Sequence, residues 1–187
     1  MKRCAWVPER DPVYVAYHDI EWGVPIREDR KLYELFLLET FQAGLSWITI
    51  LKKRENFRKA FDNFDPQRIA RYGDEKIQQL LLDKGIIRCK RKILAAVKNA
   101  GIFLSIAAEY GSFSDYLWGF VQGRPVVNRD DEIRTATSLS DAVSGDLQKR
   151  GMSYVGSVTI YSYLQAVGVV NDHETGCFRH PDNGGKE

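Results

Sequence analysis

The stretch Leu82-Asp83-Lys84-Gly85-Ile86-Ile87-Arg88-Cys89-Lys90-Arg91-Lys92-Ile93 combines a helix end, a glycine turn and a new helix start. Gly85 allows a tight turn, and the helix that follows opens with several cations. The backbone N–H groups at a helix N-terminus bind phosphate, and the helix dipole favours the same charge. The stretch therefore predicts two helices joined by a turn that suits a phosphate group. Many helix connections share this pattern, so the surrounding charge decides its interpretation.

The charge of the chain is uneven. Between Ile50 and Ala100 there are 14 Lys+Arg and 6 Asp+Glu, a net +8, whereas the remainder has 13 and 19, a net −6. The two parts sum to the net +2 of the whole chain. A locally basic half suits a polyanion such as nucleic acid, because each neutralised phosphate releases counterions. Solvated helix faces would give the same pattern, and charge alone leaves that alternative open.

Apolar residues at helical spacing dominate the chain. The predicted helices span Asp29–Gln42, Ser46–Phe61, Asp74–Leu82, Lys90–Glu109, Ser112–Val121, Ser140–Arg150 and Ser157–Val167. Ser46 and Ser140 are predicted N-caps, and Pro66 is predicted in the first turn of a further helix. Alternation typical of strands is scarce. Pro125-Val126-Val127 is too short to build a sheet on, and it lies in the one long loop-like stretch, from Arg124 to Thr137. The predicted fold class is all-α with short connections.

Composition limits the class of protein. With 187 residues, 44% hydrophobic and 28% charged, the chain suits one globular domain over residues 1–187, with a frayed polar tail at 182–187. Collagen, a disordered protein and a disulfide-rich secreted module are excluded. No apolar run approaches the roughly 18–20 residues of a membrane span, and no signal-peptide core follows the N-terminus. Three cysteines favour a reducing cytosol, so we expect a cytoplasmic protein without membrane association.

One carboxylate falls in an apolar setting. On a helical wheel Glu39 lies between Leu32 and Leu35, with Phe36 beside them. The other sides of this helix are apolar too, so the helix is expected to be buried nearly all round. A charged group there is costly unless it is paired or functional. A salt-bridged or rim-exposed glutamate is the alternative, whereas a buried one beside aromatic rings would suit a cationic or amino-bearing ring.

Aromatic residues are concentrated in the first 47 positions. They are Trp6, Tyr14, Tyr17, Trp22, Tyr33, Phe36, Phe41 and Trp47, and they include three of the four tryptophans. Phe36 and Phe41 are expected in the core. Tyr and Trp carry polar groups as well, and their faces sandwich flat bases or attract cations. Around an inward-facing carboxylate they predict a pocket for an aromatic ligand.

Cysteine and histidine lie near both ends of the chain. His173 and Cys177 have a spacing that can chelate one metal, and Cys4 with His18 would complete a tetrahedral set of four ligands. Imidazole and thiolate ligands point to Zn²⁺, and a closed shell of four points to a structural role. Buried cysteines and surface histidines are the alternative, and His180 is a competing candidate ligand.

A series of motifs follows one another along nearly the whole chain. They are Cys4-x-Trp6, Asp11-Pro12-x-Tyr14, Tyr17-His18-Asp19-x-Glu21-Trp22-Gly23-Val24-Pro25, Gln42-Ala43-Gly44-Leu45-Ser46-Trp47, Leu51-Lys52-Lys53-Arg54-Glu55-Asn56 and Asn171-Asp172-His173. Together they closely resemble the 3-methyladenine DNA glycosylase I family. The resemblance implies a helix-hairpin-helix DNA glycosylase fold, with the helix-hairpin-helix around residues 74–109. It also implies a structural zinc that ties 4–18 to 173–177 through Cys4, His18, His173 and Cys177.

The resemblance further implies a base pocket. The matching residues are Glu39, Tyr17 and Trp47, with Trp6, Tyr14 and Trp22 around them. Glu39 would accept hydrogen bonds from the amino edge of the base, Tyr17 would fix its orientation, and Trp47 would stack on it. Thr40-Phe41 departs from the family pattern and would reshape a pocket wall if it reached one.

The implied activity is base-excision repair: hydrolysis of the N-glycosidic bond of 3-methyladenine in alkylated double-stranded DNA. Such an enzyme extrudes the target nucleotide, because the reacting bond is inaccessible in the stack. Water is the expected nucleophile, and no lysine suits a lyase step, so a monofunctional, monomeric enzyme that releases free 3-methyladenine is expected. The expected DNA contacts are Gly44 and Leu45, which would fill the gap in the duplex, and Gly85, Arg88, Lys90 and Arg91, which would contact phosphate.

Two other functions fit parts of the sequence. The first is a non-enzymatic, zinc-stabilised nucleic-acid-binding module, whose aromatic residues would stack on bases without releasing them. The second is a cysteine-dependent hydrolase built on Cys89 or Cys177, which has little support because no histidine is near Cys89 in sequence.

Overall fold

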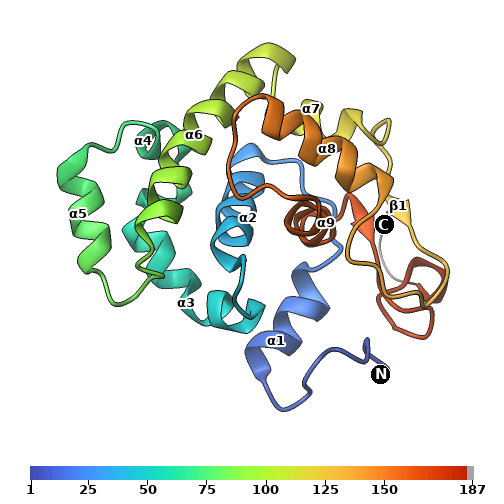
Figure 1. Ribbon diagram of the computed structural model, residues 1–187. Helices are drawn as coiled ribbons and strands as arrows, with labels where there is room; N and C mark the ends of the chain where they lie inside the picture. Colours follow the sequence, from blue (N-terminus) through green and yellow to red (C-terminus); the bar gives the residue numbers. More distant parts are fainter. Residues whose placement is uncertain (185–187) are drawn as a thin grey trace.

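The computed structural model describes residues 1–184, and most of these residues form α-helices (Figure 1). In chain order the elements are α1 (Pro12–Ala16), the π-helical turn η1 (Tyr17–Glu21), α2 (Asp29–Gln42), α3 (Trp47–Ala60), η2 (Asp62–Phe64), α4 (Pro66–Ile69), α5 (Asp74–Leu82), α6 (Lys90–Tyr110), α7 (Phe113–Gly119), β1 (Val126–Val127), α8 (Ser138–Lys149), α9 (Ser157–Ala166), β2 (Val170–Asn171) and η3 (Pro181–Asn183). The two-residue strands pair in parallel, Val126 with Val170. The mostly helical fold class is confirmed.

The helix bounds agree closely with the sequence prediction at α2 and α5, and differ at the short elements. Helix α1 was not predicted, although Asp11 caps it by accepting hydrogen bonds from two backbone amides, with Pro12 in the first turn. The predicted cap at Ser140 is wrong. Thr137 is the N-cap of α8, and Ser140 is the third helical residue, whose hydroxyl completes a capping box.

Helix α2 lies at the centre of the molecule (Figure 1). Each residue from Leu32 to Phe41 is buried, because α3, α6, α7 and α9 all pack against this helix. Its aromatic side chains pack edge to face, with Phe36 on Tyr163 at 5.6 Å and Phe41 on Phe57 at 4.9 Å between ring centroids. Because this helix is buried on every side, the carboxylate of Glu39 has no direct access to bulk solvent.

The two ends of the described chain meet. The amide of Phe178 donates to the carbonyl of Lys2 at 2.9 Å, and the amide of Ala5 donates to the carboxylate of Glu174 at 2.7 Å. Around them lies a second, smaller apolar cluster that includes Cys4, Tyr17, Trp22 and Cys177. The N-terminal segment is therefore held by the C-terminal one.

The tail departs from the predicted fraying at its first residues. Pro181–Asn183 form a short 3-10 turn, and the side-chain Nδ2 of Asn183 donates to the carbonyls of Thr175 and Cys177 at 2.7 and 2.9 Å. Residues 185–187 of the predicted tail lie outside the described part of the chain.

Among residues 1–184, α6 is the one helix whose length and hydropathy would allow it to cross a membrane. A core helix of a soluble protein passes the same test. Ile93, Phe103 and Ile106 of α6 are fully buried against the neighbouring helices. The apolar face of α6 is thus used inside the protein.

Candidate active site and metal cluster

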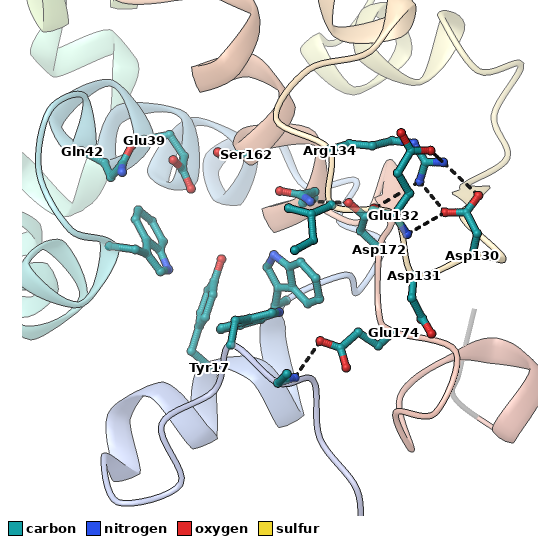
Figure 2. A pocket seen from close by; sticks show the side chains of 16 residues that line it. Tyr17, Glu39, Gln42, Asp130, Asp131, Glu132, Arg134, Ser162, Asp172 and Glu174 are labelled. Atoms are coloured by element: carbon teal, nitrogen blue, oxygen red, sulfur yellow. Dashed lines mark hydrogen bonds and ion pairs between the residues drawn. The ribbon is translucent and has the colours of Figure 1, made fainter.

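A pocket of ≈ 510 Å³ opens between η1, α2, α9 and the loop that follows β1 (Figure 2). Its lining residues are Ala5, Trp6, Tyr17, Trp22, Glu39, Gln42, Trp47, Asp130, Asp131, Glu132, Ile133, Arg134, Ser162, Gln165, Asp172 and Glu174. The structure thus brings Glu39, Tyr17 and Trp47 into one cavity, although the turn and helices between them separate them in sequence.

Glu39 is the buried carboxylate of the pocket. It is 4% exposed, and within residues 1–184 no group forms a hydrogen bond or an ion pair with it. Burial raises the pKa of Glu39 to about 8, with no neighbouring charge to offset it. A buried carboxylate without a partner is costly to a fold. It therefore marks a position where a ligand would supply the missing partner.

Tyr17 and Trp47 stand beside the carboxylate. Their ring centroids are 5.5 Å apart, and in Figure 2 the hydroxyl of Tyr17 points into the pocket from the side opposite Glu39. Burial, and then the charge of Glu39, hold the pKa of Tyr17 well above its usual value, so its hydroxyl stays protonated. The indole Nε1 of Trp47 is buried without a hydrogen-bond partner in the described chain. Among the described residues, the carboxylate of Glu39 and the Nε1 of Trp47 are therefore pocket groups without a hydrogen-bond partner.

The other predicted aromatic residues divide into two sets. Trp6 and Trp22 line the pocket and pack edge to face, with centroids 4.9 Å apart. Tyr14 does not line it. Its ring packs against Trp6 at 5.6 Å and supports that wall from outside. Phe41 does not reach the pocket either, because it lies in the core against Phe57. The departure from the family pattern at Thr40-Phe41 therefore leaves the lining intact.

Two residues of the pocket lining, Gln42 beside Glu39 and Asp172 across the pocket, were not predicted from the sequence. Gln42 was available from the sequence, since it lies one helical turn after Glu39 on the same helix. Asp172 had no local signal. Its carboxylate accepts hydrogen bonds from Tyr161 Oη at 2.7 Å, from Gln165 Nε2 at 2.6 Å and from the side-chain Nδ2 of Asn128. These bonds fix an acidic group at the pocket wall.

The loop after β1 adds more negative charge to this wall. Arg134 pairs with Asp130 at 2.8 Å and with Glu132 at 2.7 Å, and Asp131 accepts from the amide of Thr175 at 2.8 Å. Counted over the lining, six carboxylates face one guanidinium. The pocket therefore favours a ligand with positive charge over an anionic one.

The predicted metal ligands come together on the far side of Trp22. One ligand atom from each of Cys4, His18, His173 and Cys177 lies within 4.8 Å of every other, and all four residues are buried. His173 Nδ1 is 3.5 Å from Cys4 Sγ and 3.6 Å from Cys177 Sγ, and His18 Nε2 is 3.5 Å from Cys177 Sγ. His180 is not part of this group, because its Nε2 contacts the carbonyl of Asn128 at 3.0 Å.

Each member of the cluster has a further partner. His18 Nδ1 contacts Asp19 Oδ1 at 2.7 Å, and His173 Nε2 contacts the carbonyl of Trp22 at 3.1 Å. The sulfur of Cys4 accepts from the amide of Glu174, and that of Cys177 accepts from the amide of Arg179, both at 3.4 Å. Outer partners of this kind orient metal ligands and select the nitrogen that faces the metal.

A charged clasp holds η1, the element that carries Tyr17. Arg54 of α3 donates to Glu21 of η1 and to Glu34 of α2, each at 2.6 Å. Arg58 adds a 2.7 Å bond to Glu34, whose side chain is 2% exposed. The clasp ties η1 to the two helices that carry Glu39 and Trp47.

The predicted DNA-contacting residues lie on another side of α2. Arg88, Lys90 and Arg91 are exposed at the start of α6, and among residues 1–184 no side chain caps that helix N-terminus. The amide of Gly85 is already bonded to Asp83 Oδ1 at 2.7 Å. The open amides are therefore those of the first turn of α6, and the expected phosphate contact of the Gly85 amide has a competitor within the chain.

The Gly44–Leu45 turn projects between α2 and α3. Gly44 has φ +80°, a conformation that favours glycine, and nothing lies within 4 Å of the position a Cβ would take. Leu45 is 37% exposed. This small apolar tip is open to a partner.

Comparison with known proteins identifies the family of this chain. The sequence profile of the methyladenine glycosylase family matches residues 6–180. DNA-3-methyladenine glycosylase 1 of Escherichia coli (strain K12) is 48% identical over 186 residues, which cover 98% of this chain and 99% of that protein. A crystal structure of 3-methyladenine DNA glycosylase I superposes with a TM-score of 0.92 at 51% identity, over 96% of this chain and 100% of that chain.

A variant of 3-methyladenine DNA glycosylase I, whose structure contains 3-methyladenine, superposes with a TM-score of 0.90 at 37% identity. The match covers 95% of this chain and 96% of that one. Family profile, full-length identity and three-dimensional similarity agree, and the chain belongs to the methyladenine glycosylase family.

Proposed function

We propose that this chain is a base-excision repair enzyme that hydrolyses the N-glycosidic bond of 3-methyladenine in alkylated DNA. The observation that carries the proposal is Glu39, a carboxylate buried without a partner in an aromatic pocket. Membership of the family indicates the class of reaction. The acidic lining of the pocket explains why a cationic base would be the substrate. A base methylated at N3 is cationic while it is attached to the sugar, and the acidic lining favours such a ring over a neutral one.

The base is held by three contacts. Glu39 accepts hydrogen bonds from the exocyclic amino edge, Trp47 stacks on the electron-poor ring, and Tyr17 fixes the orientation of the base. A cation against Glu39 favours its ionised form and offsets the cost of burial. As the bond breaks, positive charge passes from the base to C1′, so the charge pair with the base alone favours the ground state. Acceleration therefore requires contacts that are stronger in the transition state than in the bound substrate.

The cleavage step needs only water. The C1′–N bond breaks with its electron pair leaving on the base, which departs neutral, and the oxygen of water bonds to C1′ and gives its proton to solvent. None of the residues that line the pocket is a lysine. No amine is therefore available to form a Schiff base with C1′, which supports a monofunctional enzyme that stops at the abasic site.

Double-stranded DNA is the proposed partner, and α5, the 83–89 turn and α6 are the proposed helix-hairpin-helix. The open amides of α6, with Arg88, Lys90 and Arg91, would hold a phosphate. Leu45 would enter the gap left by the extruded nucleotide.

Zinc is the proposed structural metal. With Zn–S at about 2.3 Å and Zn–N at about 2.0–2.1 Å, tetrahedral ligands place nitrogen and sulfur about 3.6 Å apart. Three of the four nitrogen–sulfur distances in the cluster, at 3.5, 3.5 and 3.6 Å, match this value. Cys4, His18, His173 and Cys177 would close the shell, so the metal would join the chain ends and leave no position for a reacting water.

The test is release of free bases from methylated duplex DNA, resolved by chromatography, with Glu39→Gln as the comparison. Release of 3-methyladenine by the wild type, reduced in the variant, would support both the reaction and the pocket. Folded, metal-loaded wild type that binds DNA without releasing a base would instead indicate a nucleic-acid-binding module. The cysteine hydrolase has no support in the pocket, because neither Cys89 nor Cys177 lines it.

A further inference from the structure

Two half-buried lysines of the basic segment end on backbone carbonyls of neighbouring turns. They are Lys92, in the first turn of α6, and Lys53, in the middle of α3. Each donates hydrogen bonds to two backbone carbonyls of a distant turn. Lys53 reaches the 83–89 turn between α5 and α6, and Lys92 reaches the turn between α2 and α3. The positive charge of this region therefore has two uses, and only part of it is available for phosphate.

Lys92 caps the C-terminal end of α2. Its Nζ donates to the carbonyl of Phe41 at 2.8 Å and to that of Ala43 at 2.6 Å. The last carbonyls of a helix lack partners within the helix, and a cation there also suits the helix dipole. The turn that follows is closed by the amide of Leu45, which donates to the carbonyl of Gln42 at 2.7 Å. Lys92 thus fixes the base of the Gly44–Leu45 turn.

Lys53 holds the 83–89 turn, called the hairpin turn below, in the same way. Its Nζ donates to the carbonyls of Lys84 and Gly85, each at 3.2 Å. The turn also lies close against α3, since a Cβ at Gly85 would meet the Cβ of Asn56 at 3.0 Å. Only glycine allows this approach without displacement of a neighbour.

The two contacts are reciprocal. Helix α3 follows the Gly44–Leu45 turn and sends Lys53 to the hairpin turn, whereas α6 follows the hairpin turn and sends Lys92 back to the Gly44–Leu45 turn. Each turn is held by a side chain whose position depends on the other. Two independent sets of hydrogen bonds, one from Lys53 and one from Lys92, therefore fix the distance between the two turns.

We propose that Lys53 and Lys92 are positioning residues that transmit phosphate contact at the hairpin into insertion of Leu45 at the lesion. The inference rests on the proposed function, and it separates this pair from the cations that touch DNA. It follows that their loss affects the opening of the duplex more than the affinity for phosphate or the chemistry in the pocket.

The experiment compares two duplexes under single-turnover conditions. In one, 3-methyladenine is paired with thymine. In the other, the opposite position is an abasic site, so extrusion costs less. Lys92→Met keeps the length of the side chain and removes its donor. We expect its excision rate to fall about 10- to 100-fold on the paired duplex and by less than about threefold on the second. Lys92→Arg, which keeps a donor, should recover most of the rate.

The salt dependence of DNA affinity provides a second readout. Removal of a phosphate contact lowers the slope of log affinity against log salt by about 0.9. We expect that decrease for Lys90→Met and no such decrease for Lys92→Met. Lys98→Met removes an exposed charge from α6 six residues further on, and it should leave the rate on both duplexes unchanged.

An equal loss on both duplexes, or a lower salt slope for Lys92→Met, would overturn the inference. If Lys92→Met does not fold, Lys53→Met makes the same test at the other turn. A wild type that releases no base from either duplex would instead overturn the proposed function, so the two failures are distinguishable.

Discussion

The Cys/His cluster and the pocket around Glu39 both contact the side chain of Trp22, yet the polar groups of the two regions differ in how they are satisfied. In the cluster each ligand residue has a second partner: Asp19, the carbonyl of Trp22, or a backbone amide. In the pocket the carboxylate of Glu39 and the Nε1 of Trp47 have none within residues 1–184. Both regions are buried, so burial does not account for the contrast.

The difference separates a site that is complete within the protein from one that needs a ligand. Buried polar groups are normally satisfied, and the exceptions call for an explanation. Satisfied groups stabilise the fold, so their removal should lower the free energy of unfolding. Unsatisfied groups destabilise the fold until a ligand arrives, and their loss should be measured as activity.

The largest effect should come from breaking the cluster. Cys177→Ser, or removal of metal by a chelator, should lower the free energy of unfolding by several kcal/mol and the Tm by more than about 10 °C. The protein that stays folded should retain activity, because the cluster lies outside the pocket lining. Differential scanning calorimetry measures the Tm, metal analysis measures the bound metal, and the base-release assay measures the remaining activity. Cys89→Ser is the matched control and should leave Tm unchanged; an unaltered Tm in Cys177→Ser with metal still bound would end the structural interpretation.

Glu39→Gln should show the opposite behaviour. We expect an activity loss of about 10²-fold or more on 3-methyladenine in DNA, by analogy with removal of a preorganised electrostatic group, without loss of folding. Chromatography of released bases measures the rate, and calorimetry checks the fold. Equal rates for the wild type and the variant would remove Glu39 from the site.

Stability should depend on pH through the same residue. Since the pKa of Glu39 is about 8 in the fold and about 4.3 unfolded, the unfolded chain ionises first as pH rises. Ionisation of Glu39 therefore costs stability progressively between about pH 4.5 and 8, on the order of 3–5 kcal/mol in total. Relative to wild type, Glu39→Gln should gain that much at pH 8.5 and little at pH 5, measured by urea unfolding. A difference that is the same at both pH values would contradict the raised pKa.

The sequence anticipated the parts of the molecule that periodicity or residue type encodes locally. The bounds of α2 and α5 follow from apolar spacing, and the burial of Glu39 follows from its place on a wheel that is apolar all round. The acidic wall could not be found in this way. Asp172 reaches the pocket because β2 pairs with β1, and two-residue strands leave no pattern in a sequence. Likewise the inward direction of Lys92 depends on where α2 ends, which the basic segment itself does not show.

The clasp extends the comparison to a third buried group. Glu34 is as buried as Glu39, but it is fully partnered by Arg54 and Arg58. Arg54→Met should therefore act as a stability variant, with a loss of about 2–3 kcal/mol in urea unfolding. The double variant with Glu34→Gln should lose less than the sum of the single changes, because no buried charge is left uncompensated. Additive losses would show that the clasp is not a coupled unit.

The smallest effect belongs to the second unpaired group of the pocket. Trp47→Phe keeps an aromatic face for the base and removes the buried Nε1 that lacks a partner. The variant loses contact area, which lowers stability, and removes an unsatisfied donor, which raises it by about 1–3 kcal/mol. In the protein without ligand we expect these two effects on stability nearly to cancel. We expect binding of free 3-methyladenine to weaken, because Nε1 can no longer donate to the ligand or to a water beside it. Calorimetric titration with the free base measures that step. A large loss of stability with unchanged affinity would mean that Trp47 belongs with the satisfied, structural groups, and the contrast between cluster and pocket would then depend on Glu39 alone.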